Sequence, residues 1–159
     1  MIDHTGVNVS RPDVSRRFYE QALAPLGYAV LAEIPKEFTG GRVVLGYGVA
    51  PKPDFWLAEG TPSEPRIHIA FRADSRAQVD AFYRAAMAAG GKDNGPPGPR
   101  PHYHEHYYGA FVLDPDGHNI EAVCHQPWAA SASRSGQVPV QASVRVCPNA
   151  MRARAIPRR

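Results

Sequence analysis

The sequence is poor in cysteine and lacks any long apolar segment. It has two cysteines in 159 residues, Cys124 and Cys147, which form no CxxC pair and have no histidine at a metal-ligand spacing. No uninterrupted apolar run approaches the roughly 20 residues that cross a bilayer, and no basic segment followed by an apolar stretch opens the chain. We therefore expect a cytoplasmic protein without disulfides and without a membrane partner. Cys124 is predicted to be a small apolar strand residue rather than a nucleophile.

Acidic residues are missing from the last part of the chain. Residues 128–159 contain no Asp or Glu, but they contain six arginines, Arg134, Arg145, Arg152, Arg154, Arg158 and Arg159. The other residues carry 12 basic and 15 acidic side chains, a net charge of −3, although the whole chain has a net charge of +3. Arginines spread this thinly, without aromatic residues between them, make a poor site for nucleic acid. We expect a basic, loosely ordered tail and no nucleic-acid partner.

The first 127 residues contain an internal repeat with an offset of 64 residues. The segment from His4, HTGVNVSRPDVSRRFY, aligns with the segment from His68, HIAFRADSRAQVDAFY, and both end in a Phe-Tyr pair. The same offset aligns Gly27 with Gly91. The repeat predicts one domain, residues 1–127, built from two modules of about 1–62 and 65–127.

Each module is predicted to consist of a strand, a helix and three further strands. The helices are expected to begin near Pro12 and near Asp74, and to end before Gly27 and Gly90. Alternating or continuous apolar residues predict strands at 2–9, 29–34, 42–48, 54–58, 66–72, 107–114 and 119–125, with a weak strand near 100–104. The glycine- and proline-rich residues 95–99 are predicted to form a loop, and residues 114–117, DPDG, a turn.

Strand alternation predicts which side chains share a face. The odd-numbered apolar residues of strand 66–72 should pack under the helix, so His68 lies on the opposite, concave face, and His4 does so by the repeat. In strand 119–125 the apolar residues have even numbers, so Glu121 also faces the cavity. Two imidazoles and one carboxylate with open coordination positions suit Fe(II) or Mn(II), with Zn, Ni or Mg as further candidates. Each residue alone could equally be a hydrogen-bonded or solvated surface group.

Three segments resemble signatures of the glyoxalase/bleomycin-resistance/extradiol-dioxygenase superfamily, also called the vicinal oxygen chelate superfamily. They are IDHTGVNVSRPDVSRRFY, RIHIAF and FVLDPDGHNIEAV, and they span about residues 1–125. The resemblance implies an α+β fold of two tandem βαβββ modules, whose curved mixed sheets form half-barrels around a central cavity with the helices outside. It also implies metal ligands on the first and last strands of the modules, which map onto His4, His68 and Glu121. Members often pair modules across a dimer, so we expect a homodimer with a small-molecule substrate.

One position departs from the glyoxalase I pattern. That branch uses a fourth ligand, a carboxylate, and the residue 64 positions before Glu121 is Leu57. Glu59 could substitute only if the strand register slips. Lactoylglutathione lyase activity is therefore disfavoured, whereas extradiol dioxygenases and fosfomycin-modifying thiol transferases use two histidines and one glutamate.

The favoured function is a divalent-metal-dependent oxidoreductase, dioxygenase-like, that acts on a small molecule with vicinal oxygens. A metal-dependent thiol transferase or lyase of the same superfamily is the enzymatic alternative. A metal-free binding protein of the bleomycin-resistance type is the second alternative, although a sequestering site needs no such ligand set.

Histidines alternate in residues 101–108, PHYHEHYY. If this segment is extended, its histidines share a face and could move protons, because imidazole titrates near neutrality. The alternative is a polar loop with exposed histidines. His104, His106 and Tyr108 are the candidate catalytic residues, because they precede or begin a cavity strand.

Two of four further polar residues have two interpretations each. Arg66 and Arg72 flank His68 and could hold an anionic substrate or lie in solvent at the rim. His118 in the predicted turn and His125 near a strand end are predicted to be structural.

Overall fold

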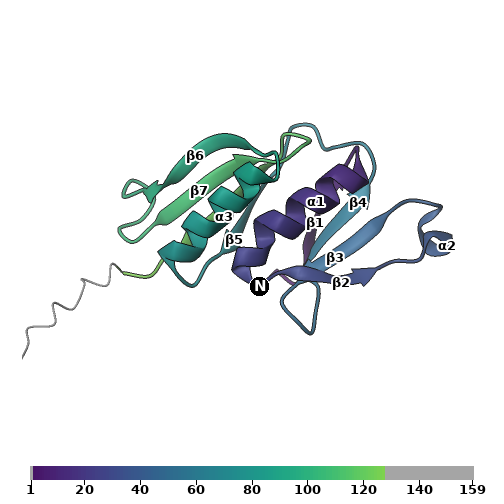
Figure 1. The fold of residues 1–159 in the computed structure, drawn as a ribbon, viewed down its shortest axis with the longest axis horizontal. Helices are drawn as coiled ribbons and strands as arrows, with labels where there is room; N and C mark the ends of the chain where they lie inside the picture. The colour runs from purple at the N-terminus through teal and green to yellow at the C-terminus, as the bar shows by residue number, and fades with distance from the viewer. Residues whose placement is uncertain (1, 128–159) are drawn as a thin grey trace, which may run out of the picture. The chain divides into compact units, whose positions relative to one another are not determined.

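Two four-stranded sheets form the described part of the chain, residues 2–127, in the computed structural model (Figure 1). The first sheet has the strand order β1 (Thr5–Val9), β4 (Phe55–Glu59), β3 (Val44–Gly48) and β2 (Ala29–Glu33). The second has the order β5 (His68–Arg72), β8 (Asn119–Cys124), β7 (Tyr108–Leu113) and β6 (Lys92–Pro99). In each sheet the first strand is parallel to the last strand of its module, and the other pairs are antiparallel. The predicted α+β fold of two βαβββ modules is confirmed, whereas the predicted tail and Cys147 lie outside the described residues.

The long helices begin and end near the positions that the sequence predicts. Helix α1 (Pro12–Leu23) has proline in its first turn and runs into a 3₁₀ turn, Ala24–Leu26, which ends at Gly27 with φ of 82°. Helix α3 (Arg76–Ala88) is capped by Ser75, whose side chain accepts a hydrogen bond from Gln78 N. A short helix α2 (Lys36–Thr39) connects β2 to β3. No helix within residues 2–127 has the length and apolarity of a membrane-spanning segment.

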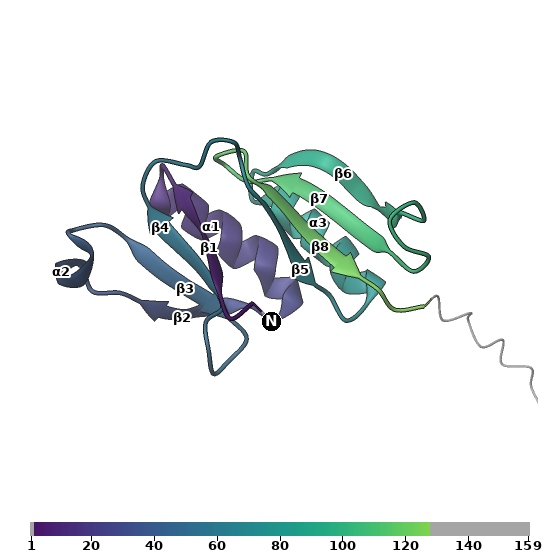
Figure 2. The same ribbon diagram turned by 180° about the vertical axis from the view of Figure 1, so that it is seen from behind.

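Helices α1 and α3 pack together on one face, and both sheets lie behind them (Figures 1 and 2). One hydrophobic core runs through both modules. Within it, the ring of Phe55 on β4 contacts the ring of Phe71 on β5, with centroids 5.2 Å apart. Gly91 makes close packing possible, because a Cβ there would come within 2.9 Å of the Phe18 ring of α1. Because they share this core, the two modules are one packed unit rather than independent halves.

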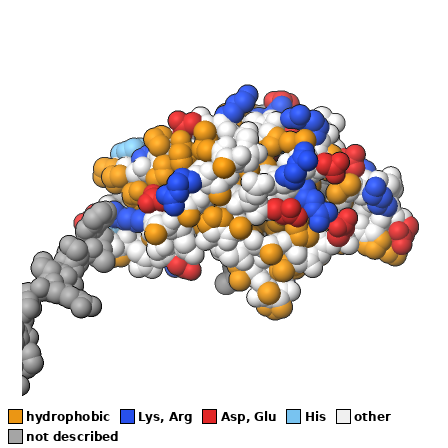
Figure 3. All heavy atoms as spheres, in the orientation of Figure 1, with side chains coloured by type: hydrophobic (Ala, Val, Ile, Leu, Met, Phe, Trp, Pro, Cys, Tyr) orange, Lys and Arg blue, Asp and Glu red, His pale blue; other side chains and the backbone are white. Residues whose placement is uncertain are grey.

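On the surface, Lys and Arg side chains lie among Asp and Glu side chains on the face shown in Figure 3.

The DPDG turn between β7 and β8 connects the second module to the first. Asp114 is 3% exposed, and its carboxylate accepts hydrogen bonds from Tyr19 Oη of α1 at 2.7 Å and from His118 N at 2.8 Å. His118 is fully buried, accepts from Ile67 N through Nδ1 at 3.3 Å and donates to Asn8 O of β1 through Nε2 at 3.1 Å. These contacts support the structural role predicted for His118.

The predicted loop at residues 95–99 is wrong, and so is the predicted weak strand near 100–104. Residues 92–99 form strand β6, while residues 101–103 are a turn. β6 is the outer strand of its sheet, and it pairs with β7 with register shifts around Gly95 and Gly98. Proline and glycine are tolerated there because an outer strand leaves one row of backbone groups unpaired and a bulge absorbs the irregular positions.

We expect Tyr19→Phe to lower the free energy of unfolding by about 1–3 kcal/mol, because it removes a hydrogen bond to a buried carboxylate. Tyr47→Phe is the matched control, since the Tyr47 hydroxyl is buried without a hydrogen-bond partner among the described residues. Its loss should change the stability by less than about 0.5 kcal/mol or raise it. Urea unfolding measures both variants, and an equal loss in both would contradict the role assigned to the Tyr19 hydroxyl.

Candidate functional site

A histidine and a glutamate lie together on the face of the second sheet that is turned away from the helices. His68 is the first residue of β5, and Glu121 pairs with Ala70, so both side chains leave the sheet on the same side. His68 Nε2 lies 2.9 Å from Glu121 Oε2. The Glu121 side chain is 1% exposed, whereas the His68 side chain is 52% exposed. A buried carboxylate therefore holds an imidazole that remains open to solvent.

Tyr107 is the second partner of this carboxylate, and the sequence analysis missed it. Its hydroxyl donates a hydrogen bond to Glu121 Oε1. Gly109 leaves room for this contact, since a Cβ there would lie 2.9 Å from Glu121 Oε1 and 3.0 Å from the Tyr107 ring. Burial, and then the hydrogen bond to Glu121, raise the pKa of Tyr107 well above its ordinary value. Tyr107 therefore keeps its proton at neutral pH and orients Glu121.

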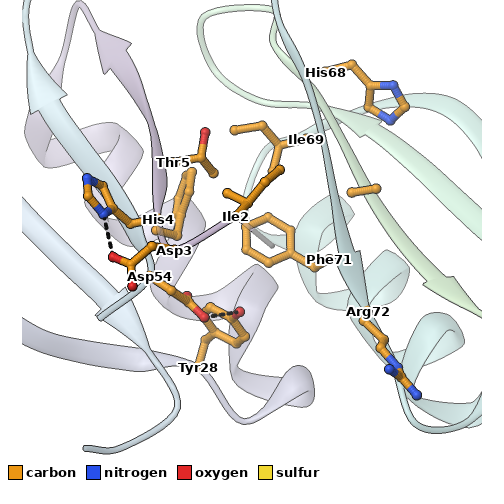
Figure 4. A pocket seen from close by; sticks show the side chains of 12 residues that line it. Ile2, Asp3, His4, Thr5, Tyr28, Asp54, His68, Ile69, Phe71 and Arg72 are labelled. Atoms are coloured by element: carbon orange, nitrogen blue, oxygen red, sulfur yellow. Dashed lines mark hydrogen bonds and ion pairs between the residues drawn. The ribbon is translucent and has the colours of Figure 1, made fainter. Parts of the chain in front are cut away.

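His4 does not join His68 and Glu121 within one chain. It precedes β1, and its Nδ1 lies 2.8 Å from Asp3 Oδ1. His4 and His68 both line a cavity of about 350 Å³ between the N-terminal residues and β5, but they lie at opposite ends of it (Figure 4). Within residues 2–127, no three His, Cys, Asp or Glu side chains gather closely enough to hold a metal ion.

The first-module counterpart of Glu121 is Trp56, so the prediction of Leu57 is wrong. Gly6 of β1 pairs with Trp56, as Ala70 of β5 pairs with Glu121. Leu57 is instead fully buried in the core. Glu59 pairs with Val9 on the core side, and its carboxylate accepts a hydrogen bond from Val43 N. The position opposite Glu121 in the repeat thus carries an indole and no carboxylate.

A family model of the Glyoxalase/Bleomycin resistance protein/Dioxygenase superfamily matches residues 1–122. The chain belongs to this superfamily. A glyoxalase/bleomycin resistance protein from Albidiferax ferrireducens T118 is 30% identical over 79% of this chain and 98% of its own, with a TM-score of 0.59. No relative matches among the proteins with curated descriptions.

Two more distant superfamily structures show the same fold. A glyoxalase/bleomycin resistance protein/dioxygenase family enzyme from Burkholderia phytofirmans PsJN is 18% identical over 79% of this chain and 98% of its own, with a TM-score of 0.58. Glyoxalase I from Zea mays is 19% identical over 77% of this chain and 43% of its own, with a TM-score of 0.56. At these identities the likeness concerns the fold alone.

Among residues 2–127, none of the three candidate catalytic residues forms a side-chain hydrogen bond with His68 or Glu121. Residues 100–107 form a hairpin loop rather than a strand, so the histidines do not share a strand face. His104 is exposed, and its Nδ1 accepts a hydrogen bond from His106 N. Tyr108 begins β7 but points to the helix side, where its hydroxyl donates to Asp80 Oδ1 at 2.8 Å. Strand alternation could have identified Tyr107. It lies on the same side of β7 as Phe111, which is the pairing partner of Glu121.

The polar residues that flank the predicted ligands in the sequence differ in their surroundings. Arg66 donates to the backbone oxygens of Asp116 and Ser63, so it braces the turn rather than facing an open site. Arg72 is exposed and lines the cavity beside β5. His125 is exposed, and its ring packs against the Tyr107 ring with centroids 5.1 Å apart.

The Tyr28–Asp54 hydrogen bond in the same cavity predicts an alkaline loss of stability. Burial and the nearby Asp54 carboxylate raise the pKa of Tyr28 from 10.0 to about 12, and Tyr28 Oη donates to Asp54 Oδ2 at 3.2 Å. The folded state binds this proton more tightly than the unfolded chain. Its stabilisation is therefore complete below about pH 10 and is lost as the pH rises towards about 12. The stability difference between the wild type and Tyr28→Phe, measured by urea unfolding, should shrink over this range, and a constant difference would refute the assignment.

Proposed function

We propose that the chain is a divalent-metal-dependent enzyme of the superfamily, dioxygenase-like, whose ion is held by His68 and Glu121 of one copy and His4 of a second copy. The observation that carries the proposal is the pair His68 Nε2 and Glu121 Oε2, 2.9 Å apart on the open face of the second sheet. A carboxylate that is 1% exposed is costly to bury without partners. Its placement beside an accessible imidazole supports a site that binds a cation.

The donor chemistry fits a divalent ion of the first transition series. Imidazole nitrogen and carboxylate oxygen together suit Fe(II) and Mn(II), and the two residues leave most coordination positions open. A third protein ligand has to come from elsewhere, because the described chain brings no third side chain to the pair. His4 is the candidate, since its side chain is 63% exposed and a homodimer could bring it to His68.

The residues around the pair would prepare a substrate site. A bound ion would supply Lewis acidity to two adjacent substrate oxygens and, as iron, a path for electrons to dioxygen. Tyr107 keeps its proton and holds one oxygen of Glu121, which leaves the other oxygen and the His68 nitrogen as ligands. Phe111 lies beside His68, with ring centroids 6.2 Å apart, and offers an aromatic surface next to the proposed ion.

Two alternatives within the superfamily differ in their requirements. A lactoylglutathione lyase of the four-ligand type is disfavoured by Trp56, which occupies the position of the fourth carboxylate. A metal-free binding protein of the bleomycin-resistance type is favoured by one observation, that His4 lies apart from the other two candidate ligands within a chain. Metal analysis separates this alternative from the enzyme.

The purified wild-type protein should retain iron or manganese, and His68→Ala and Glu121→Gln should lose it, because each removes a proposed ligand. Tyr107→Phe should weaken metal binding by about tenfold, since it frees the ligating carboxylate to reorient. Tyr108→Phe is its matched control, and His102→Ala, on the exposed hairpin, controls for the loss of a histidine. Elemental analysis after dialysis measures the content, and a wild type without metal would contradict the enzyme proposal.

Mixing two defective variants tests whether the site is shared between copies. His4→Ala and Glu121→Gln should each lack metal alone. After unfolding and refolding together, heterodimers would contain one intact site, and about a quarter of the wild-type metal content should return. If none returns although heterodimers form, the ligands do not come from two chains.

Oxygen uptake with catechol should separate a dioxygenase from a thiol transferase. The iron-loaded wild type should consume dioxygen in proportion to the catechol that disappears, and Glu121→Gln should not. An oxygen electrode and the ultraviolet absorbance of the product measure this reaction. Metal retention without oxygen uptake for any catechol would favour transfer of a thiol to an epoxide instead.

A further inference from the structure

A second cavity, of about 330 Å³, opens beside the His68–Glu121 pair on the second sheet. It lies between β5 and the hairpin that joins β6 to β7. His68 and Asn119 line its inner side, and Arg100, Tyr103 and Phe111 line the side formed by the hairpin and β7. His68 thus belongs to both cavities, so a ligand in the second one contacts the imidazole that the proposed metal site uses.

The guanidinium of Arg100 is held in place at this cavity by backbone groups. Nη1 donates to Pro99 O at 3.2 Å and Nη2 donates to Pro96 O at 2.8 Å. Gly98 makes this position possible, because a Cβ there would lie 2.9 Å from Nη1. Among the described residues no carboxylate forms an ion pair with Arg100. A fixed, half-buried cation without an acidic partner is prepared to bind an anion.

Aromatic rings form part of the cavity wall, and the amides of Asn94 and Asn119 supply polar groups beside them. Arg100 Cζ lies 5.7 Å from the centroid of the Phe111 ring, which also lies beside His68. Tyr103 packs edge to face against Tyr107 with ring centroids 5.2 Å apart. Aromatic rings beside a cation, with the amides of Asn94 and Asn119 on the remaining walls, favour a planar ligand that carries one negative group and further polar substituents.

We propose that this cavity binds a small aromatic carboxylate, with Arg100 as the residue that holds the carboxylate group. The ring of the ligand lies along Phe111, and its far edge reaches His68. The cavity volume is that of a site for a small ligand, and the planar fork of Arg100 matches a carboxylate. That this ligand is the substrate rests on the proposed function. The binding of the carboxylate by Arg100 does not, because it needs no metal.

Benzoate and benzamide test the anion site, because they share shape and ring and differ in charge. In ¹H–¹⁵N NMR titrations of the wild type, benzoate should shift the Arg100 Nε–H signal and the amide signals of Gly95 and Gly98. It should bind at least about fivefold more tightly than benzamide. Arg100→Gln should remove this preference, and Arg100→Lys should keep part of it.

Arg84→Gln is the matched control, because Arg84 is an exposed arginine on α3, and it should keep the wild-type preference. The spectra also report whether each variant is folded. Equal binding of benzoate and benzamide to the wild type, shifts confined to other residues, or a preference that survives in Arg100→Gln would overturn the proposal.

Metal analysis of the same samples keeps the two proposals distinguishable. A wild type that binds benzoate through Arg100 but retains no metal supports the anion site and contradicts the metal-dependent enzyme. A wild type that retains metal but does not prefer benzoate supports the enzyme and contradicts the anion site.

Discussion

The carboxylate of Glu121 sets the strictest requirement in this structure. It is almost completely buried, and both of its oxygens are occupied, one by His68 and the other by Tyr107. Leaving a carboxylate unpaired at such a site would cost several kcal/mol. Three features position the partners of this carboxylate: the pairing of β5 with β8, the glycine at position 109, and the hairpin that carries Tyr107. The candidate site is therefore part of what holds the second sheet together.

The two modules share a plan but have diverged at the site. A buried Asp114 and a buried His118 hold the second module against the first through Tyr19 and Asn8. These polar contacts cross a continuous apolar core, and they fix the modules in one arrangement. On the open faces, however, the first module carries Trp56 where the second carries Glu121. At this position the first sheet therefore offers an indole and the second a carboxylate.

Much of the fold could be predicted from the sequence, because strand periodicity and the repeat are strong local signals. Alternation placed His68 and Glu121 on one face, and the structure shows them in contact. The offset of 64 fails in the later strands because the second module has one residue more between its helix and its third strand. That shift explains why Trp56, and not Leu57, is the counterpart of Glu121. After a single inserted residue, an alignment at a fixed offset assigns every later residue to the wrong face, and nothing in a local pattern locates the insertion.

The site could be predicted only in part, because contacts of loops depend on how the chain turns. Tyr107 and Tyr108 are adjacent and chemically alike, yet they point to opposite sides of the sheet. The conformation of the hairpin that precedes β7 determines which of the two reaches Glu121. The pattern of histidines in the hairpin does not predict that conformation. His4 shows the same limit, since the repeat predicts the face that it shares with His68 but not the distance between the two residues.

The prolines of β6 have a consequence for how copies of this chain can associate. Pro96, Pro97 and Pro99 lie on the outermost strand of the second sheet, and none has an N–H to offer to an added strand. A continuous sheet running from one molecule into the next is therefore blocked at this border, as it is in proteins that resist fibril formation. Two molecules that associate along this border would therefore do so through side-chain contacts rather than through shared backbone hydrogen bonds.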